Sequence, residues 1–583
     1  MVRDHRLNRR ETLKAGAAIT ACAALAGTAA AQTPTMLKLR VLETTDLHVN
    51  IMPYDYFRDG PDDTVGLAKT ASLIKAAQAD AKNSLLFDNG DFLQGSSLGD
   101  YIAYKKGLKA GDTHPMLAAM NALPYLCGTI GNHEFNYGLE FLDHGLAKAD
   151  FPMVCANVER IGGYSLVDPW RLFEQSFEDE AGNRHVLKIG VIGFVPPQIM
   201  QWDKGHLDGK LIATDIVDAA DKHMPGLRDA QPDLVIALCH SGIAGGTRRG
   251  MEENAALRLS KGEDIDVILT GHQHRVFPGG KSFDGIAGVD NVKGSLNGKP
   301  ACQPGFWGSH LGIIDLELEK RGERWKIADF RVEAKPIYER TPDRKIVPKA
   351  AAEPAVLAAV KADHEATLTY MREPVGSTAA PINSYFALVA DDPSIQIVAE
   401  AQIAYAKPLM AQTRWKNLPI LSAAAPFKSG GRSGPSFYTD IPAGPLALKN
   451  IADIYLYPNT VQIVKVSGSD VREWLERSAG IFNRIDPAKS DEQSLINPAF
   501  PAFNFDVIDG VTYRIDVTQA SRYDNDGKLV APDAHRILDL AFAGEPIDEK
   551  TEFLIVTNNY RASGGGNFPG TRTTVVLEAP DLN

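Results

Sequence analysis

Five short segments of the chain combine aspartate, histidine and asparagine at spacings that suit binding of divalent metal ions. They are Asp46-Leu47-His48, Asn89-Gly90-Asp91, Gly131-Asn132-His133-Glu134, His240-Ser241-Gly242 and Gly271-His272-Gln273-His274. Carboxylate oxygen, imidazole nitrogen and amide oxygen are ligands for zinc, manganese or iron. A single Asp-x-His pair is usually incidental, but five such segments in one chain indicate a metal centre.

The spacing within these segments indicates how they would share the ions. Residues two apart on a strand point to the same face, so Asp46 and His48 can bind one ion together. His272 and His274 have the same spacing, but a turn could divide them between two ions. Asp91 has two carboxylate oxygens and can bridge a pair of ions. Two ions about 3.5–4 Å apart hold a phosphate and lower the pKa of a water molecule, so the chemistry indicated is phosphate ester hydrolysis.

Short apolar runs, many of them β-branched, are predicted to form the strands that position these segments. A helical pattern lies between two of these strands at Ala68–Lys82. Polar residues at the ends of buried strands are typical of α/β enzymes. We expect the strands of one sheet to bring the five segments to a single edge. The predicted strands are Leu37–Thr44, Ser84–Phe87, Val186–Phe194, Leu234–Leu238 and Val267–Leu269.

The chain of 583 residues is too long for one compact core, so two domains are expected. Residues 37–340 are predicted to form the first domain, and residues 375–583 the second. Residues 341–374 form a linker, in which Pro354–Met371 has the spacing of a helix that ends before Pro374. The strands predicted in the second domain are Ile454–Leu456, Val461–Val466, Tyr513–Val517 and Phe553–Thr557.

The formal net charge of −12 argues against a nucleic-acid polymer as partner, because such binding needs a broad basic surface. A small phosphate-bearing substrate is compatible with this charge, since metal ions reverse the field locally. Four cysteines lie beyond the N-terminal segment, and one or two disulfide bridges among them stay open. They are Cys127, Cys155, Cys239 and Cys302.

The first 31 residues have the pattern of an export signal. Arg9 and Arg10 precede an alanine-rich apolar run that ends in a small-residue cleavage site near Ala31, which indicates a twin-arginine signal peptide and a periplasmic protein. An ordinary secretory signal is the alternative. Cys22 lies in a weak lipoprotein box, but we favour cleavage near Ala31. No later stretch is long and apolar enough to span a bilayer, so no stable membrane anchor is expected.

Together the five segments resemble the DxH, GDxxQG, GNHE, H and GHxH pattern of the calcineurin-like metallophosphoesterases. The chain is similar to the nucleotidase branch, and within it to the bifunctional 2′,3′-cyclic-nucleotide 2′-phosphodiesterase/3′-nucleotidases. Residues 45–50, 131–139 and 455–460 carry that likeness. The resemblance implies an α/β fold: a metallophosphoesterase β-sandwich flanked by helices, joined by a linker helix to a C-terminal α/β nucleotide-specificity domain.

The resemblance also implies the ligand sets of two divalent ions, with zinc and manganese as candidates. One ion would bind Asp46, His48, Asp91 and His274, and the other Asp91, Asn132, His240 and His272. His133 would be the catalytic histidine, which stabilises charge on phosphate or protonates the leaving oxygen. The 5′-nucleotidases typically have Asp where this chain has Asn136, so the cyclic-phosphodiesterase branch is favoured.

By the same resemblance, the second domain binds a small nucleotide substrate. Tyr457 and Tyr560 would stack on the base, Asn459 would hydrogen-bond its edge, and Arg432 would lie in a glycine-rich loop near the substrate. Either tyrosine alone is more often plain core packing. The expected reaction opens the 2′ P–O bond of a 2′,3′-cyclic nucleotide by metal-activated water and then hydrolyses the 3′-nucleotide. The alternatives are a 5′-nucleotidase or nucleotide-sugar hydrolase, and a non-catalytic nucleotide-binding protein.

Overall fold

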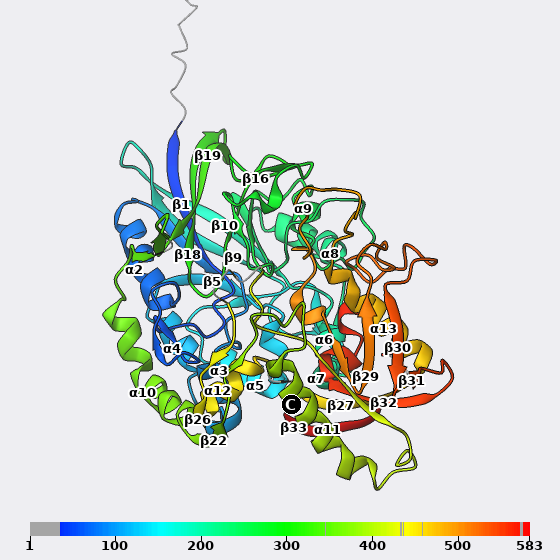
Figure 1. Cartoon of the computed structure of the whole chain (residues 1–583). Helices are drawn as coiled ribbons and strands as arrows, with labels where there is room; N and C mark the ends of the chain where they lie inside the picture. The colour runs from blue at the N-terminus through cyan, green and yellow to red at the C-terminus, as the bar shows by residue number, and fades with distance from the viewer. Residues whose placement is uncertain are drawn as a thin grey trace, which may run out of the picture.

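The computed structural model describes residues 35–343, 345–431, 434, 437–457, 459–571 and 575–582. The predicted signal peptide of residues 1–31 and the predicted substrate residue Arg432 lie outside these described residues. Two bodies of secondary structure follow one another along the chain (Figure 1).

The first domain contains two β-sheets. A six-stranded sheet has the order β19-β18-β1-β4-β5-β6. Its strands are β1 (Met36–Thr44), β4 (Ser84–Asp88), β5 (Tyr125–Thr129), β6 (Met153–Val154), β18 (His310–Arg321) and β19 (Arg324–Pro336). The larger sheet has the order β15-β16-β17-β13-β12-β10-β9, with β14 (Val276–Phe277) paired to β17. Its other strands are β9 (Trp170–Glu178), β10 (Arg184–Phe194), β12 (Leu234–Cys239), β13 (Val267–Thr270), β15 (Val289–Asp290), β16 (Ser295–Leu296) and β17 (Lys299–Pro304).

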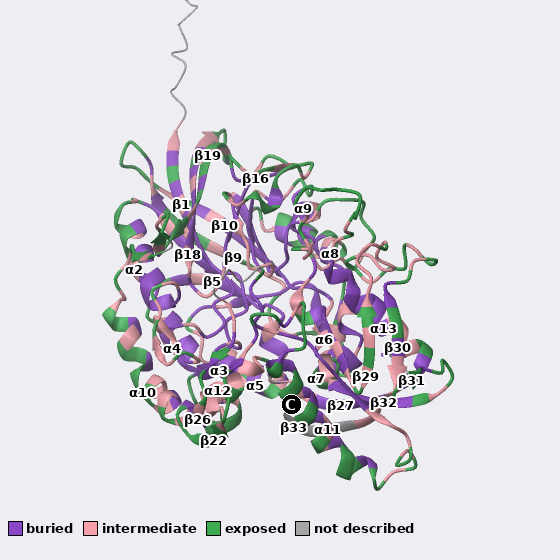
Figure 2. Ribbon diagram, viewed as in Figure 1, coloured by how far each residue is buried: buried purple, intermediate pink, exposed green. Residues whose placement is uncertain are grey.

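The two sheets pack face to face as a β-sandwich. Val41 and Phe87 from the first sheet share one buried cluster with Val191, Leu238 and Leu269 from the second. These interior strands have apolar residues on both faces because helices cover the outer sides, as in the buried centre of the first domain in Figure 2. The five strands predicted from the apolar runs are confirmed. The expectation that one sheet carries all five polar segments is wrong, because they come from both layers of the sandwich.

Helices cover both outer faces of the sandwich. On the six-stranded sheet they are α2 (Leu67–Ala79), α4 (Pro115–Asn121) and α5 (Leu139–Leu146). On the other sheet they are α8 (Ile216–Asp229) and α9 (Ala256–Leu259). The carboxylate of Asp215 accepts hydrogen bonds from the N–H groups of Val217 and Asp218, which caps α8 at its start.

The predicted linker helix is present as α10 (Pro354–Met371), which begins with proline in its first turn, where the missing N–H costs no hydrogen bond. Val356 and Val360 of this helix are fully buried in the core beside the six-stranded sheet. The helix therefore packs as part of the first domain. The domain boundaries themselves stay a prediction.

The second domain is built on a five-stranded sheet with the order β28-β24-β32-β27-β33. Its strands are β24 (Ile420–Ala424), β27 (Thr460–Ser467), β28 (Val507–Asp509), β32 (Glu552–Asn558) and β33 (Val575–Leu582). Helices α11 (Pro393–Met410) and α13 (Gly468–Ser478) pack against it. The strand predicted at Ile454–Leu456 is wrong: α12 (Leu448–Ile454) ends there and an extended connection follows. Three apolar residues are too few to separate a short strand from the end of a helix.

Asp59 joins the two domains. It lies between β2 (Tyr54–Asp55) and β3 (Gly60–Pro61), accepts hydrogen bonds from Arg372 just after α10, and also accepts one from Lys449 of α12 at 3.0 Å.

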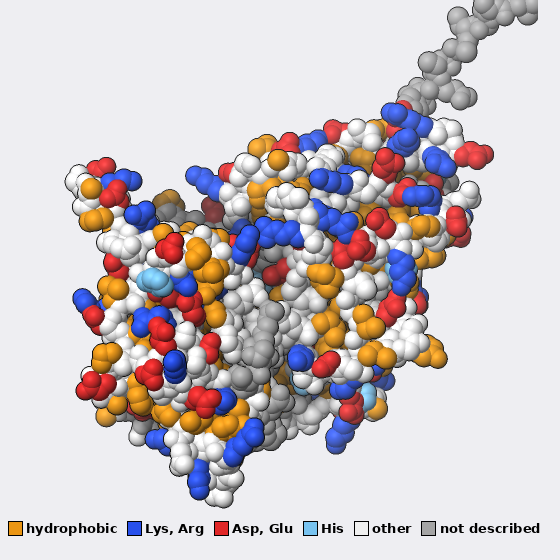
Figure 3. Space-filling view, turned by 90° about the vertical axis from the view of Figure 1, so that its right-hand side faces the viewer, with side chains coloured by type: hydrophobic (Ala, Val, Ile, Leu, Met, Phe, Trp, Pro, Cys, Tyr) orange, Lys and Arg blue, Asp and Glu red, His pale blue; other side chains and the backbone are white. Residues whose placement is uncertain are grey.

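Charged side chains of both signs are interspersed on the face in Figure 3. Each described helix is too short or too polar to span a bilayer. The four cysteines beyond the N-terminal segment are buried free thiols.

Candidate metal centre and nucleotide pocket

Each of the five polar segments begins at the carboxyl end of a strand. Asp46 follows β1, Asp91 follows β4, and Asn132 follows β5 in the six-stranded sheet, while His240 follows β12 and His272 follows β13 in the other. The sandwich thus brings the seven predicted ligands and His133 to one end of the first domain. Five of the ligands have left-handed backbone φ angles between 47° and 69°, a conformation that non-glycine residues adopt rarely and that recurs at functional sites. They are Asp46, His48, Asp91, His272 and His274.

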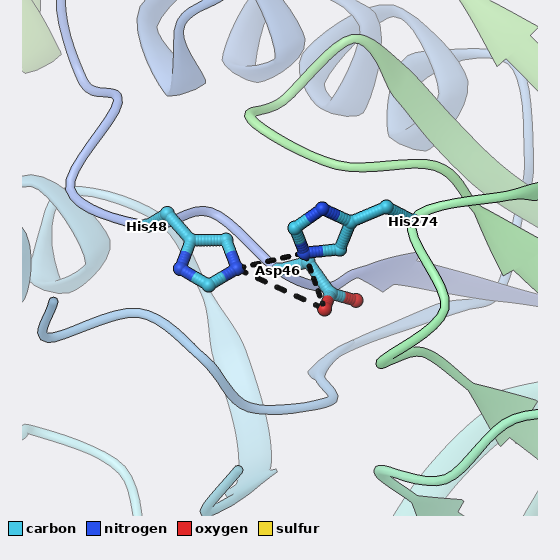
Figure 4. Close-up of side chains that lie close together, drawn as sticks. All are labelled: Asp46, His48 and His274. Atoms are coloured by element: carbon cyan, nitrogen blue, oxygen red, sulfur yellow. Dashed lines mark hydrogen bonds and ion pairs between the residues drawn. The ribbon is translucent and has the colours of Figure 1, made fainter. Parts of the chain in front are cut away.

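The first group of ligand atoms contains Asp46, His48 and His274 (Figure 4). Nε2 of His48 and Nε2 of His274 lie 2.9 Å apart, and Oδ1 of Asp46 lies 3.3 Å from the latter nitrogen. Nδ1 of His48 donates to the carbonyl oxygen of Gln94 at 2.9 Å, which leaves the lone pair on Nε2. Burial lowers the pKa of His48 to about 3, so its ring is neutral, as a metal ligand must be.

The second group contains Asp91, His240 and His272. Oδ2 of Asp91 lies 3.0 Å from Nε2 of His240 and 3.7 Å from Nε2 of His48, so one carboxylate contacts both groups. Nδ1 of His240 lies 2.6 Å from the carbonyl oxygen of Asn89, so its buried Nε2 is the nitrogen that faces Asp91. Nδ1 of His272 lies 2.8 Å from Oδ1 of Asn132.

The buried charges around Asp91 are those of a cation site. Burial alone would raise the pKa of Asp91, but His240 and His133 hold it well below its ordinary value, so the carboxylate is ionised. Burial acts to lower the pKa of His240, but the carboxylates of Asp91 and Asp46 outweigh it and raise that pKa to about 10. Carboxylates that attract positive charge, imidazole nitrogens and an amide oxygen therefore converge here, and Nε2 of His240 faces this group. This donor set fits divalent transition ions.

Glu134 holds two of the metal-site loops together, a role that no sequence argument assigned to it. Its carboxylate accepts hydrogen bonds from the backbone N–H groups of Asp91, Phe92, Leu93 and Gly131 at 2.6–2.9 Å. Gly131 is required at this place, because a Cβ atom there would lie 2.2 Å from Oδ1 of Asp91. The signal available in the sequence was the acidic residue that closes the Gly-Asn-His-Glu segment.

His133 lies at the candidate metal centre, where it forms a third group of possible ligand atoms with His48 and Asp91. Its backbone N–H donates to Oδ1 of Asp91 at 2.7 Å, and its ring contacts that of His48 edge to face with centroids 4.9 Å apart. Nδ1 of His133 lies 2.6 Å from Oδ1 of Asn136. Two further contacts on the site come from residues that sequence reasoning missed: Trp202 stacks on His272 at 5.7 Å, and Glu253 hydrogen-bonds it.

The predicted base-stacking residues lie in the second domain. Tyr457 is 38% exposed and contacts Phe427 edge to face at 5.1 Å. Tyr560 lies over Gly565, where a Cβ atom would come within 2.5 Å of the ring. Burial raises the pKa of Tyr560 to about 12, and the charges of Glu253 and Tyr457 act in the same direction. The charge of Glu253 in the first domain therefore acts on Tyr560 in the second.

The side-chain amide of Asn459 is hydrogen-bonded within the second domain. Its Nδ2 donates to the hydroxyl of Tyr455 at 3.2 Å, and Nδ2 of Asn558 donates to the same hydroxyl at 3.1 Å. Arg432 lies outside the described residues. Contact of Tyr457, Asn459, Tyr560 and Arg432 with a nucleotide stays a prediction.

Comparisons with known proteins match both domains. Residues 39–276 match the calcineurin-like phosphoesterase family model, and residues 374–573 match that of the 5′-nucleotidase C-terminal domain. The chain is 48% identical to a Salmonella typhimurium protein named 2′,3′-cyclic-nucleotide 2′-phosphodiesterase/3′-nucleotidase, over 94% of this chain and 84% of that protein. It is 49% identical to the trifunctional nucleotide phosphoesterase protein YfkN of Bacillus subtilis over 91% of this chain, and spans about a third (36%) of that protein.

Among solved structures, a 5′-nucleotidase precursor from Thermus thermophilus aligns with a TM-score of 0.61 at 18% identity. The alignment covers 94% of each chain. At that identity the likeness concerns the fold alone, and it extends over both domains.

Proposed function

The chain belongs to the calcineurin-like phosphoesterases that carry a 5′-nucleotidase C-terminal domain, and on that premise we propose that it hydrolyses 2′,3′-cyclic nucleotides to 3′-nucleotides and these to nucleoside and phosphate. One observation carries the chemistry: Asp91 lies between two groups of ligand atoms and contacts a histidine of each. The substrate class follows from relatives that are 43–48% identical and are named for this pair of reactions.

The residues present fit two divalent ions. Asp46, His48, Asp91 and His274 would hold one, and Asp91, Asn132, His240 and His272 the other, with zinc or manganese as candidates. Such ions supply Lewis acidity that lowers the pKa of a water molecule and neutralises phosphate charge. The chain contributes imidazoles whose second nitrogens are fixed by carbonyl oxygens, as Gln94 does for His48 and Asn89 for His240.

His133 is the residue we assign to the reacting phosphate. It is close to Asp91 and His48, yet its Nδ1 is occupied by Asn136, which leaves Nε2 to face the substrate. That nitrogen can stabilise charge on a phosphate oxygen or give a proton to the leaving ribose oxygen. Tyr457 and Tyr560 hold the base, and so place the phosphate at the end of the first domain.

A phosphate-release assay with 2′,3′-cyclic AMP, 3′-AMP and 5′-AMP tests the proposal. We expect turnover of the first two substrates and much slower release from 5′-AMP. Faster release from 5′-AMP would assign a 5′-nucleotidase instead, and the absence of turnover with added zinc or manganese would leave a binding protein. Chelator treatment followed by metal titration and elemental analysis gives the identity and number of the ions.

Export of the protein is a further part of the proposal. It rests on Arg9, Arg10 and the apolar run to Ala31, all outside the described residues. Fractionation of cells that express the full chain should place the mature protein in the periplasm. Replacement of both arginines by lysine should retain it in the cytoplasm if the twin-arginine route is used.

A further inference from the structure

The side-chain amide of Asn136 lies between the proposed catalytic histidine and a buried carboxylate. Its Oδ1 lies 2.6 Å from Nδ1 of His133, and its Nδ2 donates to Oδ1 of Asp203 at 2.9 Å. Asp203 is 7% exposed and lies 67 positions after Asn136 in the chain. The three side chains therefore form a linear hydrogen-bonded series that leads away from the candidate metal centre.

The chemistry of Asp203 determines the direction of every hydrogen bond in this series. Burial raises the pKa of Asp203 to about 6, so above that pH its carboxylate is ionised and only accepts hydrogen bonds. The NH₂ group of Asn136 must then face Asp203, as its 2.9 Å contact has it, and its oxygen must face His133. An amide oxygen only accepts, so Nδ1 of His133 carries the hydrogen. Nε2 is then the nitrogen available to the substrate. Without Asp203, either end of the Asn136 amide could face the ring.

The position of Asp203 in the chain supports a role at the site rather than in local folding. It occupies the N-cap of the short helix α7 (Lys204–Leu207), where aspartate ordinarily accepts from helix N–H groups. Its side chain makes no such capping bond. Its Oδ1 accepts from Asn136 instead, and its buried Oδ2 has no partner among the described residues.

The segment that carries Asp203 contacts the site at two other points. Trp202, the last residue of α6 (Ile199–Trp202), stacks on the candidate ligand His272 at 5.7 Å and 22°. The ring of His206 packs over Gly138, where a Cβ atom would lie 3.2 Å from Nδ1 of that ring. Residues 202–206 thus pack against both the His272 turn and the turn after His133, which keeps Asp203 at a fixed distance from Asn136.

We propose that Asp203 is a positioning residue for His133: through Asn136 it fixes the hydrogen on Nδ1 and directs Nε2 of His133 at the substrate. The inference rests on the proposed role of His133 in phosphate ester hydrolysis. It adds a carboxylate that touches neither substrate nor metal ligand by hydrogen bond and that acts through one intervening amide.

Four variants of the full-length protein test this role. Asp203→Ala removes the acceptor, whereas Asp203→Asn keeps an oxygen that can accept from Asn136. The exchange Asn136→Asp with Asp203→Asn restores a donor opposite an acceptor at both contacts, while Asn136→Asp alone puts two carboxylates together. Asp208→Ala, on an exposed residue of the same segment, is the matched control.

We expect Asp203→Ala to lower kcat on the order of ten- to a hundredfold, the usual range for loss of such a supporting partner, with KM within about twofold. Asp203→Asn should recover most of kcat, and the exchanged pair should be more active than Asn136→Asp alone. Metal content and melting temperature should match the wild-type protein and the Asp208→Ala control.

The decisive measurement combines Asp203→Ala with His133→Ala. If Asp203 acts through His133, the double variant has the kcat of His133→Ala alone. A further loss of the same factor in the double variant, or a kcat of Asp203→Ala equal to wild type, would overturn the proposal. The rates are measured on bis(p-nitrophenyl) phosphate, whose turnover does not depend on nucleoside recognition, so a wrong nucleotide assignment and a wrong role for Asp203 give different results.

Discussion

Glu253 accepts a hydrogen bond from Nε2 of His272 at 2.8 Å, while Nδ1 of the same ring lies 2.8 Å from Oδ1 of Asn132. A carboxylate on one ring nitrogen fixes the tautomer and orients the other nitrogen toward an ion. Burial raises the pKa of Tyr560 in the second domain, and the charge of Glu253 acts in the same direction. Glu253 therefore acts on a proposed metal ligand through a hydrogen bond and on a proposed base-stacking residue through its charge.

We expect Glu253→Ala to weaken binding of the ion at His272 by about ten- to a hundredfold, because His272 loses the partner that orients it. Glu253→Gln should fall between this variant and the wild-type protein, since its amide oxygen can still accept from Nε2. Titration of the metal-depleted protein with zinc, followed by calorimetry, measures the affinities of the two ion sites separately. Unchanged affinity in Glu253→Ala would show that Asn132 and His240 orient the ion without it.

Replacement of His133 by alanine should lower turnover far more than it lowers metal content. His133 forms with Asp91 and His48 a third group of atoms that could hold a metal ion, but its Nδ1 is engaged by Asn136 and neither proposed ligand set includes it. Removal of a general acid or a charge-stabilising donor typically costs about 10²–10⁴-fold in kcat. Elemental analysis of the purified variant provides the check. Loss of an ion from it would make His133 a ligand.

Asp91→Ala should be the most damaging of the ligand variants. Asp91 is the residue that contacts both groups, and its loss removes the negative charge between two cations. We expect the variant to retain neither ion tightly. Asp46 belongs only to the group of His48 and His274, so Asp46→Ala should retain the ion at His240. Two tightly bound ions in Asp91→Ala would contradict the bridging assignment.

How far the sequence predicts this molecule depends on the range of the interactions. Apolar runs and helical spacing identified β1, β4, β12, β13 and α10, because these patterns are local. The pairing of two sheets was not predictable in this way, since Asp46 and His272 meet only after the sandwich forms. The left-handed backbone at the ligands is likewise absent from the pattern, because aspartate and histidine adopt it only where surrounding structure enforces it.

The supporting residues of the site show the same limit. Residue types predicted the metal-site histidines, since Asp and His at strand ends indicate metal chemistry without further context. Asp203 and Glu253 are ordinary acidic residues in loops, and only the fold brings them to Asn136 and His272. The substitution of Asn136 for a family aspartate raised the question of what orients His133, and the contact with Asp203 provides an answer that sequence spacing could not.

His114 should make the protein less stable in mild acid. It is fully buried, its Nδ1 accepts from the N–H of Met116 at the start of α4, and burial lowers its pKa to about 3. The unfolded chain, with a histidine pKa of about 6.5, binds a proton that the folded chain does not, so stability falls as pH falls below about 6.5. Between about pH 6.5 and pH 5 this amounts to about 2 kcal/mol.

Denaturant unfolding of His114→Asn at about pH 7 and pH 5 checks this expectation. Asparagine can still cap α4, so the variant carries a constant packing cost but should lose about 2 kcal/mol less than the wild-type protein on acidification. His535→Asn, whose side chain is 51% exposed, is the matched control and should follow the wild-type protein. Parallel losses in wild type and His114→Asn would show that His114 takes up its proton without unfolding.

Tyr560→Ala tests whether the productive site forms between the domains. The candidate ligands precede residue 275 and Tyr560 follows residue 550, yet the charge of Glu253 acts on Tyr560 across the two domains. Loss of one stacking face costs about 1–3 kcal/mol of base binding, and it should appear mainly as a raised KM for 2′,3′-cyclic AMP because stacking acts far from phosphorus. Tyr164→Ala, on a 73% exposed tyrosine of the first domain, should leave KM unchanged. Hydrolysis of a small phosphate ester without an aromatic ring should be nearly unaffected by Tyr560→Ala. An equal loss on that ester would mean that Tyr560 supports the fold around Gly565 and does not bind the base.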